Sequence, residues 1–178
     1  MSDERCAYVL DSNFFITPYR NYYSPDIAPS YWNQLRIRIQ KTSSIYTVDK
    51  VKNEICGKKD RKKDFLSDWF RKNFPRDRII PTSKIISPYY EQVIQWAESR
   101  DFRSTALNEF KDQDNADAYV VAAALYLKEK KGFEPIVITD ESYEPRAKRR
   151  IFIPVVCKAF AIRWNGILPF VKELAIKL

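Results

Sequence analysis

The chain contains no histidine, and this absence removes several classes of enzyme mechanism. Serine and cysteine triads, histidine-based RNA transphosphorylation and ordinary zinc sites all normally need an imidazole. The chemistry that remains is that of carboxylate, lysine and hydroxyl groups. Carboxylate oxygens are hard ligands that favour Mg²⁺ or Mn²⁺, and such ions bind phosphates and activate water.

Cysteine is scarce, and long apolar runs are missing. Cys6, Cys56 and Cys157 are odd in number and have no metal-binding spacing, so we interpret them as reduced thiols in a cytoplasmic protein. The longest apolar run, residues 116–127, is interrupted by Asp117 and is much shorter than a membrane span. Because the first five residues are polar or charged, we expect neither an export signal nor a membrane anchor.

The composition is that of one packed, basic domain spanning residues 1–178. Hydrophobic residues make up 45% of the chain, which is enough for a sizeable core at this length. The net charge of +8 predicts attraction to polyanions, of which nucleic acid is the commonest. Neither repeats nor linkers indicate a second domain.

Strand-like and helix-like segments alternate along the chain, which predicts an α/β fold with a mostly parallel sheet covered by helices. We expect buried strands at 6–10 and 135–139, a short strand or connector at 45–48 and a short strand at 161–162. Helices are expected at 30–40, 49–56, around 65–70, from Pro88 with Ser87 as its N-cap, within 100–113, from 114 or 115 to 131, at 151–160 and at 167–178. Gly57 and Gly132 are suited to end two of these helices.

Two acids have the most informative positions. Asp11 ends the first apolar strand, and the carboxyl ends of parallel strands line the crevice where open α/β sheets perform chemistry. Asp117 lies on or beside the apolar stripe that Val120, Val121 and Ala124 continue. A buried carboxylate needs a cation or hydrogen-bond donors. The alternative for Asp117 is an ordinary acid in the first turn of a helix, stabilised by the helix dipole.

Further acids and their neighbours are candidates for the same site. Glu54 falls near the end of its helix, and its alternative is a solvated side chain bonded to Lys50 or Lys58. Asp140 and Glu141 follow a buried strand, where acids are also common in turns. Supporting positions are predicted for Ser12, Asn13, Asp114 and Thr139, although each is also an ordinary turn or cap residue.

Positive charge and aromatic rings supply candidate contacts to nucleic acid. The run containing Arg146, Lys148, Arg149 and Arg150 follows the strand that leads to Asp140, so it places positive charge where a phosphate backbone would lie. Such a run is also often just a solvated face. The aromatic residues between 19 and 32 have the chemistry to stack on bases, but packing of an irregular loop is the simpler interpretation.

The order of these segments resembles the PIN domain, a family of metal-dependent nucleases. The resemblance rests on the strand leading to Asp11-Ser12-Asn13, the helix bearing Glu54, the segment Asp117-Ala118-Tyr119-Val120-Val121-Ala122-Ala123-Ala124-Leu125 and the strand 136–139 before Asp140. Segments 21–32 and 153–160 are similar to a stand-alone prokaryotic branch of PIN-like proteins. The resemblance implies a three-layer α/β/α sandwich with a central, mostly parallel sheet of about five strands.

The resemblance also implies an activity and a set of ligands. Asp11, Glu54, Asp117 and Asp140 would be the catalytic acids around one or two Mg²⁺ or Mn²⁺ ions, with the fourth position open between Asp140 and Glu141. The expected protein is an endoribonuclease that hydrolyses RNA, typically the toxin of a toxin–antitoxin pair, with an antitoxin protein as a partner and a homodimer as a plausible state. Two alternatives are a PIN-like RNA-binding module that does not cleave and a phosphatase with Asp11 as nucleophile.

Overall fold

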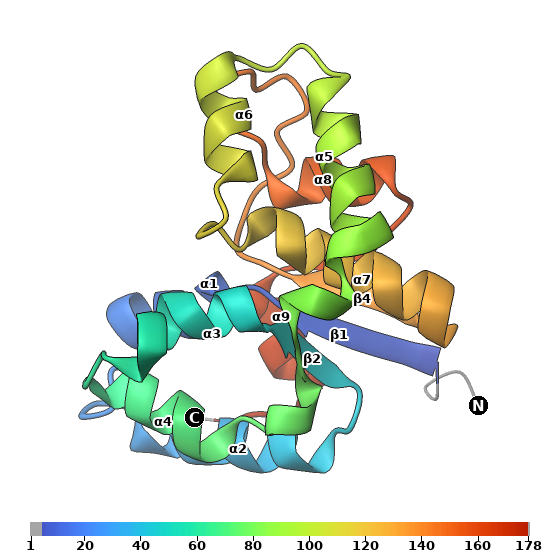
Figure 1. Ribbon diagram of the computed structural model, residues 1–178. Helices are drawn as coiled ribbons and strands as arrows, with labels where there is room; N and C mark the ends of the chain where they lie inside the picture. Colours follow the sequence, from blue (N-terminus) through green and yellow to red (C-terminus); the bar gives the residue numbers. More distant parts are fainter. Residues whose placement is uncertain (1–4, 178) are drawn as a thin grey trace.

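A computed structural model describes residues 5–177 and contains a five-stranded sheet in which all paired strands are parallel (Figure 1). The strands are β1 (Cys6–Leu10), β2 (Ile45–Val48), β3 (Ile79–Ile80), β4 (Glu134–Ile138) and β5 (Arg163–Asn165), in the order β3-β2-β1-β4-β5. The central strand β1 pairs Tyr8 with Ile45 on one side and with Ile136 on the other. The strands predicted at 6–10, 45–48 and 135–139 are therefore confirmed to within a residue.

Helices cover both faces of the sheet and give the expected three-layer α/β/α arrangement (Figure 1). One layer contains α5 (Glu91–Glu98), α6 (Ser104–Lys111), α7 (Asp117–Lys131) and α8 (Ile153–Ala159). The other contains α1 (Asn13–Thr17), α2 (Pro29–Lys41), α3 (Asp49–Cys56), α4 (Phe65–Asn73) and α9 (Ile167–Glu173). Single helical turns occur at Pro18–Tyr22, Lys58–Asp60, Arg76–Arg78, Thr82–Lys84 and Ile86–Tyr90. From β1 the chain adds β2 and β3 towards one edge of the sheet and then adds β4 and β5 on the other side of β1. Right-handed crossovers therefore place α5, α6, α7 and α8 on the face opposite to α2, α3 and α4.

Helix α7 is the centre of the domain. It packs against β1, β2, β4 and α8, and residues Ala118–Leu125 are buried without interruption. A helix that is apolar on all sides is suited to a fully enclosed position. Asp117, the first residue of α7, is therefore carried on a helix that the whole core holds in place.

Both predicted helix ends at glycine are confirmed. Gly57 follows α3 with φ 73° and ψ 160°, and Gly132 follows α7 with φ 71° and ψ 21°. These left-handed conformations cost little in glycine because it has no Cβ. The turn at Gly57 is tight, since a Cβ there would lie 3.1 Å from Lys62 Cγ.

The aromatic residues after α1 are mostly packed, as the simpler interpretation predicted. Tyr31 is 0% exposed and Trp32 2% exposed, and the indole Nε1 of Trp32 donates a 2.7 Å hydrogen bond to the carbonyl of Tyr23. The Tyr23 ring stacks on Tyr31 with centroids 4.4 Å apart. Tyr22, by contrast, is 60% exposed.

One predicted helix start was confirmed in part, and another was wrong. The helical turn Ile86–Tyr90 continues directly into α5, and Ser87 has the extended backbone of a residue that precedes a helix. Its hydroxyl bonds the side chain of Glu91 rather than a backbone N–H, so Ser87 gives no capping hydrogen bond. Helix α7 begins at Asp117, after Ala116, rather than at residue 114 or 115. The side chain of Asn115 accepts a hydrogen bond from the Asp117 N–H at 2.8 Å, so it acts from just outside the helix.

Two predictions near the carboxyl end were also wrong. Residues 161–162 form no strand, because Ala161 has a φ of +51° and the Ile162 N–H bonds the carbonyl of Cys157 in a turn that ends α8. The last helix ends at Glu173 rather than continuing to 178, and Ala175 has a φ of +53°. A positive φ in a residue with a Cβ interrupts regular structure, and alanine gives no sequence signal for it.

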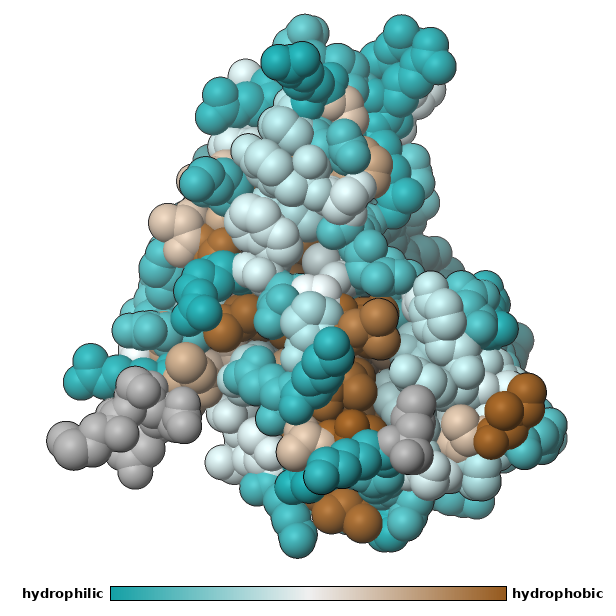
Figure 2. All heavy atoms as spheres, turned by 180° about the vertical axis from the view of Figure 1, so that it is seen from behind, coloured by the Kyte–Doolittle hydropathy of each residue, from teal (hydrophilic) through white to brown (hydrophobic). Residues whose placement is uncertain are grey.

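On the face seen in Figure 2, hydrophobic surface gathers in the lower part, over the layer that contains α2 and α9. The upper part, over α5 and α6, is mostly hydrophilic. In residues 5–177 no helix combines the length and the apolar character that crossing a membrane requires.

We predict that Gly57→Ala destabilises the protein more than Gly132→Ala does. Both substitutions force a Cβ into a left-handed backbone, but position 57 has a conformation that is essentially restricted to glycine and a close neighbour, whereas nothing lies within 4 Å at position 132. The expected losses in the free energy of unfolding are about 1–3 kcal/mol for Gly57→Ala and about 1 kcal/mol for Gly132→Ala. Urea unfolding of both variants measures the difference, and equal losses would contradict it.

Candidate acidic site

Asp11 lies at the carboxyl end of the central strand and is 1% exposed. Its Oδ1 accepts a 2.7 Å hydrogen bond from the Ser12 N–H, and its Oδ2 accepts bonds from Asn13 Nδ2 at 3.2 Å and from Thr139 Oγ1 at 3.0 Å. Thr139 follows β4, the strand beside β1, so two strand ends meet at this carboxylate. Ser12, Asn13 and Thr139 thus lie in the supporting positions expected from the sequence.

The position of Asp11 makes its ionisation unfavourable. Burial is the main cause that raises its pKa from 3.8 to about 7, and the negative charges of Glu141 and Glu54 raise it further. Hydrogen bonds from Thr139 and Ser12 act in the opposite direction because they stabilise the charged form. A buried carboxyl group whose neighbours are acids is typical of a functional site.

Asp117 faces the same cluster from the first turn of α7. Part of its side chain remains accessible, yet the pKa of Asp117 is raised well above its ordinary value by burial first, and then by the charges of Asp11, Glu141 and Glu54. Arg150 lowers that pKa. Among residues 5–177 no group donates a hydrogen bond to the Asp117 carboxylate. Asp117 does lie in the first turn of a helix, where the helix dipole stabilises an acid, as the alternative interpretation stated.

Glu54 reaches across from α3 to the beginning of α7. Its Oε1 accepts a 2.9 Å hydrogen bond from the N–H of Ala116, so the positive end of the α7 dipole stabilises this carboxylate. The predicted alternative for Glu54, a solvated side chain bonded to Lys50 or Lys58, is wrong. Lys58 instead bonds Asp114 at 2.7 Å, and Lys50 lies 5.0 Å from the centroid of the Tyr119 ring.

The structure separates the adjacent acids Asp140 and Glu141. Asp140 is exposed, whereas the side chain of Glu141 is 5% exposed and its charge raises the pKa of both Asp11 and Asp117. Glu141 Oε2 also accepts a 2.7 Å hydrogen bond from the Ile153 N–H at the start of α8. Glu141, rather than Asp140, therefore faces the other acids.

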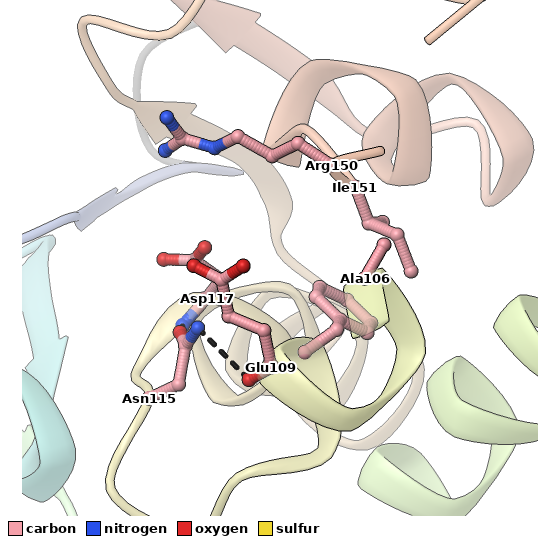
Figure 3. Close-up of a pocket in the computed structure, with 7 residues that line it drawn as sticks. Ala106, Glu109, Asn115, Asp117, Arg150 and Ile151 are labelled. Carbon is pink, nitrogen blue, oxygen red and sulfur yellow. Dashed lines mark hydrogen bonds between the residues drawn. The ribbon is translucent and has the colours of Figure 1, made fainter. Parts of the chain in front are cut away.

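Arg150 has a different position from the one expected for a phosphate-binding residue. Its guanidinium forms an ion pair with Glu141, lowers the pKa of Asp117 and lies 4.9 Å from the centroid of the Phe152 ring. It supplies the positive charge nearest to the cluster, although about half of its side chain is exposed. In Figure 3 the Arg150 side chain extends over the carboxylate of Asp117 from the opposite wall.

The other three residues of the basic run are exposed. Lys148 pairs with Asp101 at 3.6 Å, and its carbonyl accepts a hydrogen bond from the Arg103 N–H. Within the described chain, Arg146 and Arg149 form no ion pair with an acid, so they remain available to an anionic ligand. Asp114, predicted to support the site, points to Lys58 on the exposed surface instead.

Glu109 is a neighbour of the site that the sequence did not reveal. It lies on α6, and Figure 3 shows its carboxylate beside that of Asp117, both pointing into a small cleft lined also by Ala106, Arg150 and Ile151. Asn115 ties the two helices together by donating a 3.1 Å hydrogen bond to the carbonyl of Glu109. In the sequence, only the short connection between α6 and α7 indicated that Glu109 lies near Asp117. By itself Glu109 has the character of a polar surface residue.

The donors gathered here suit a hard divalent cation. They are carboxylates without sulfur or imidazole, and their mutual repulsion is relieved by added positive charge. Among the described residues, however, no three acidic side chains converge into a ready-made metal-binding group. The chemistry of the donor set therefore fits a cation, while Glu141 is held by Arg150 and Glu54 by the Ala116 N–H.

The raised pKa of Asp11 predicts how stability depends on pH in the presence of a chelator. Between about pH 4 and pH 7 the folded protein retains a proton on Asp11 that the unfolded chain has lost, so this group lowers the free energy of unfolding as the pH rises through that range. Asp11→Asn removes this loss of stability, because asparagine does not titrate. Each unit by which the pKa of Asp11 is raised corresponds to about 1.4 kcal/mol in the free energy of unfolding. The variant should therefore gain stability relative to the wild type between pH 4.5 and pH 8, as measured by denaturant unfolding.

The exposed neighbour provides the control for this measurement. Asp140→Asn makes the same chemical substitution without touching the buried group, and its stability relative to the wild type should change little across the same pH range. A stability difference between Asp11→Asn and the wild type that is independent of pH would contradict the assignment of the titration to Asp11.

Comparison with known proteins gives a single match. No curated protein matches the chain, and no solved structure matches it either. Residues 8–178 match the family described as Domain of unknown function (DUF4411), a range that begins within β1 and includes every acid discussed above. The chain belongs to the DUF4411 family.

Proposed function

We propose that this protein is a metal-dependent endoribonuclease that hydrolyses RNA phosphodiester bonds, as the resemblance to PIN domains implies. The observation that carries the proposal is the cluster of Asp11, Asp117, Glu54 and Glu141 at the carboxyl end of the central strands, where burial and mutual repulsion raise the pKa of Asp11 and Asp117. Concentrating repelling acids in a buried place is costly unless a cation or a reaction uses them.

The residues have separate roles in this proposal. Asp11 and Asp117 would hold one or two Mg²⁺ or Mn²⁺ ions, and Glu141 and Glu54 would complete the negative charge around them. A bound divalent ion of this kind supplies Lewis-acid stabilisation of a phosphate and a water molecule of lowered pKa. Thr139, Ser12 and Asn13 hold the Asp11 carboxylate in one orientation through their hydrogen bonds.

RNA is the proposed substrate because positive charge flanks the acids on two sides. The segment Lys58–Lys63 follows α3, and Lys58 reaches Asp114 near the start of α7. Arg146 and Arg149 lie on the segment between β4 and α8. A polyanionic backbone that crosses the acids would therefore meet cationic side chains before and after them. The net charge of +8 favours the same class of ligand.

The proposal extends to the biological context that the resemblance implies. The protein would act in the cytoplasm as the toxin of a toxin–antitoxin pair, with an antitoxin protein that covers the acidic cluster and with a homodimer as a possible assembly. These partners rest on the resemblance, whereas the RNA and metal assignments also rest on the charges described above.

One specific observation favours a second candidate, a PIN-like RNA-binding module without cleavage activity. Arg150 already contributes positive charge to the cluster, and the acids of the described chain do not form a three-ligand group. A protein that used the site only for RNA binding would need no divalent ion. The two candidates differ in whether Mn²⁺ stabilises the fold.

We predict that Asp117→Asn abolishes RNA cleavage while the exposed Asp140→Asn does not. Asp117 faces Asp11 and Glu141, whereas Asp140 points to solvent. Mutation of a residue that only supports a metal ligand reduces activity by up to about 100-fold. Loss of a ligand itself should therefore reduce turnover by at least about 100-fold. The measurement is cleavage of a structured RNA pool with Mn²⁺ by proteins purified identically. Equal cleavage by Asp117→Asn and the wild type would reject the site.

We also predict that Arg150→Gln lowers stability without metal and increases the stabilisation by Mn²⁺. Removing the guanidinium leaves the nearly buried Glu141 without its charged partner, which should cost about 1–3 kcal/mol, and it removes a positive charge that competes with the ion. Thermal unfolding with chelator and with Mn²⁺ measures both effects. Arg149→Gln, an exposed neighbour of the same charge, is the matched control. Absence of any Mn²⁺ effect in all three proteins would favour the binding module.

A further inference from the structure

The segment between β4 and α8, which also carries Glu141, exposes one aromatic ring. Tyr143 is 45% exposed and comes two residues after Glu141. Its ring stacks on Trp164 of β5 with centroids 5.6 Å apart and an angle of 24° between the planes. One face of the Tyr143 ring is therefore supported by the protein.

Strand register places Trp164 on the same face of the sheet as Asp11, on the edge strand two positions from β1. Trp164 pairs with Val137, and Thr139, which bonds Asp11, is two residues after Val137, just beyond the end of β4. Side chains two residues apart on a strand lie on the same face, and residues paired in register share a face. Trp164 thus lies on the same side of the sheet as Thr139 and Asp11, one strand further towards the edge.

The same segment is attached to the domain and carries unpaired positive charge. Its beginning and end are joined by the ion pair between Glu141 and Arg150, and its middle is held by the bond from Arg103 N–H to the carbonyl of Lys148. Arg146 and Arg149 are exposed and have no acidic partner among residues 5–177. Tyr143 therefore shares a segment that is anchored in several places with Arg146 and Arg149, which follow it at three and six residues along the chain.

We propose that Tyr143, supported by Trp164, is a stacking position for one nucleobase of a single-stranded RNA whose backbone contacts Arg146 and Arg149. The inference rests on the proposed function and adds how the substrate is positioned at that site. Aromatic side chains bind unpaired bases of any sequence through their faces, while arginines bind the backbone phosphates. Charge favours this occupant over an apolar protein segment, since the segment that carries the ring also carries two exposed arginines without an ion-pair partner among residues 5–177.

The test measures RNA binding rather than cleavage. In an Asp117→Asn background, a fluorescent single-stranded oligoribonucleotide is titrated with proteins that carry Tyr143→Ala, Tyr143→Phe or Tyr22→Ala. Tyr22 is the matched control because it is also an exposed tyrosine, at 60%, on the irregular segment after α1. A second series uses oligonucleotides of the same length in which bases are replaced by abasic sites.

Tyr143→Ala should weaken binding of the intact oligonucleotide by roughly 5- to 150-fold, the range for the loss of one stacked base. Tyr143→Phe and Tyr22→Ala should bind as the parent does. An abasic site at the stacked position should remove the difference between Tyr143→Ala and the parent, because no base is then left to lose.

Three outcomes would overturn the inference, and they differ from a failure of the proposed function. Unchanged affinity in Tyr143→Ala, or an equal loss for intact and fully abasic oligonucleotides, shows that the ring does not stack on a base. A loss of affinity accompanied by a lower unfolding temperature in both Tyr143 variants assigns the ring a structural role. If the parent protein itself binds no RNA at low salt, the proposed function fails and the inference fails with it.

Discussion

The carboxylate of Asp11 is almost completely buried at the carboxyl end of the central strand, and the acids around it oppose its ionisation. Each neighbouring acid is stabilised by a different part of the fold. Glu54 bonds the amino end of α7, and Glu141 bonds both Arg150 and the first turn of α8. These hydrogen bonds and the ion pair therefore stabilise the negative charges and also join the layers of the fold. Asp117 has the least compensation, and its pKa is raised accordingly.

The sequence contains enough local information to predict the layers and the positions of Asp11 and Asp117. Continuous apolar segments ending in a polar residue identified β1 and β4, and the stripe of Val120, Val121 and Ala124 placed Asp117 towards the core. These features depend on neighbours in the chain. The bonds from Ser12 and Asn13 to Asp11 are of the same local kind, because short polar side chains after a strand readily bond the preceding carboxylate.

What the sequence did not reveal depends on contacts between segments that are distant in the chain. Glu54 and Ala116 are brought together only when α3 and α7 pack on the sheet, so no local pattern indicates that Glu54 caps a helix. The choice between Asp140 and Glu141 depends on the path by which the chain leaves β4 and returns to α8. Arg150 was indistinguishable from its basic neighbours for the same reason. The wrongly predicted strand at 161–162 and the early end of α9 differ, since positive φ values occur there at alanines.

The alanines of α7 have a consequence for the geometry of the acids. Ala118, Ala122, Ala123 and Ala124 are 0% exposed, so the backbone of the helix lies close to its neighbours with no side-chain volume to spare. The distance between Asp117 and the end of β1 thus depends on these small side chains, which let the helix pack closely against its neighbours. A larger side chain at any of them would strain the core by about 1–3 kcal/mol. Relief of that strain by movement of α7 would change the spacing of the acids without altering any acid.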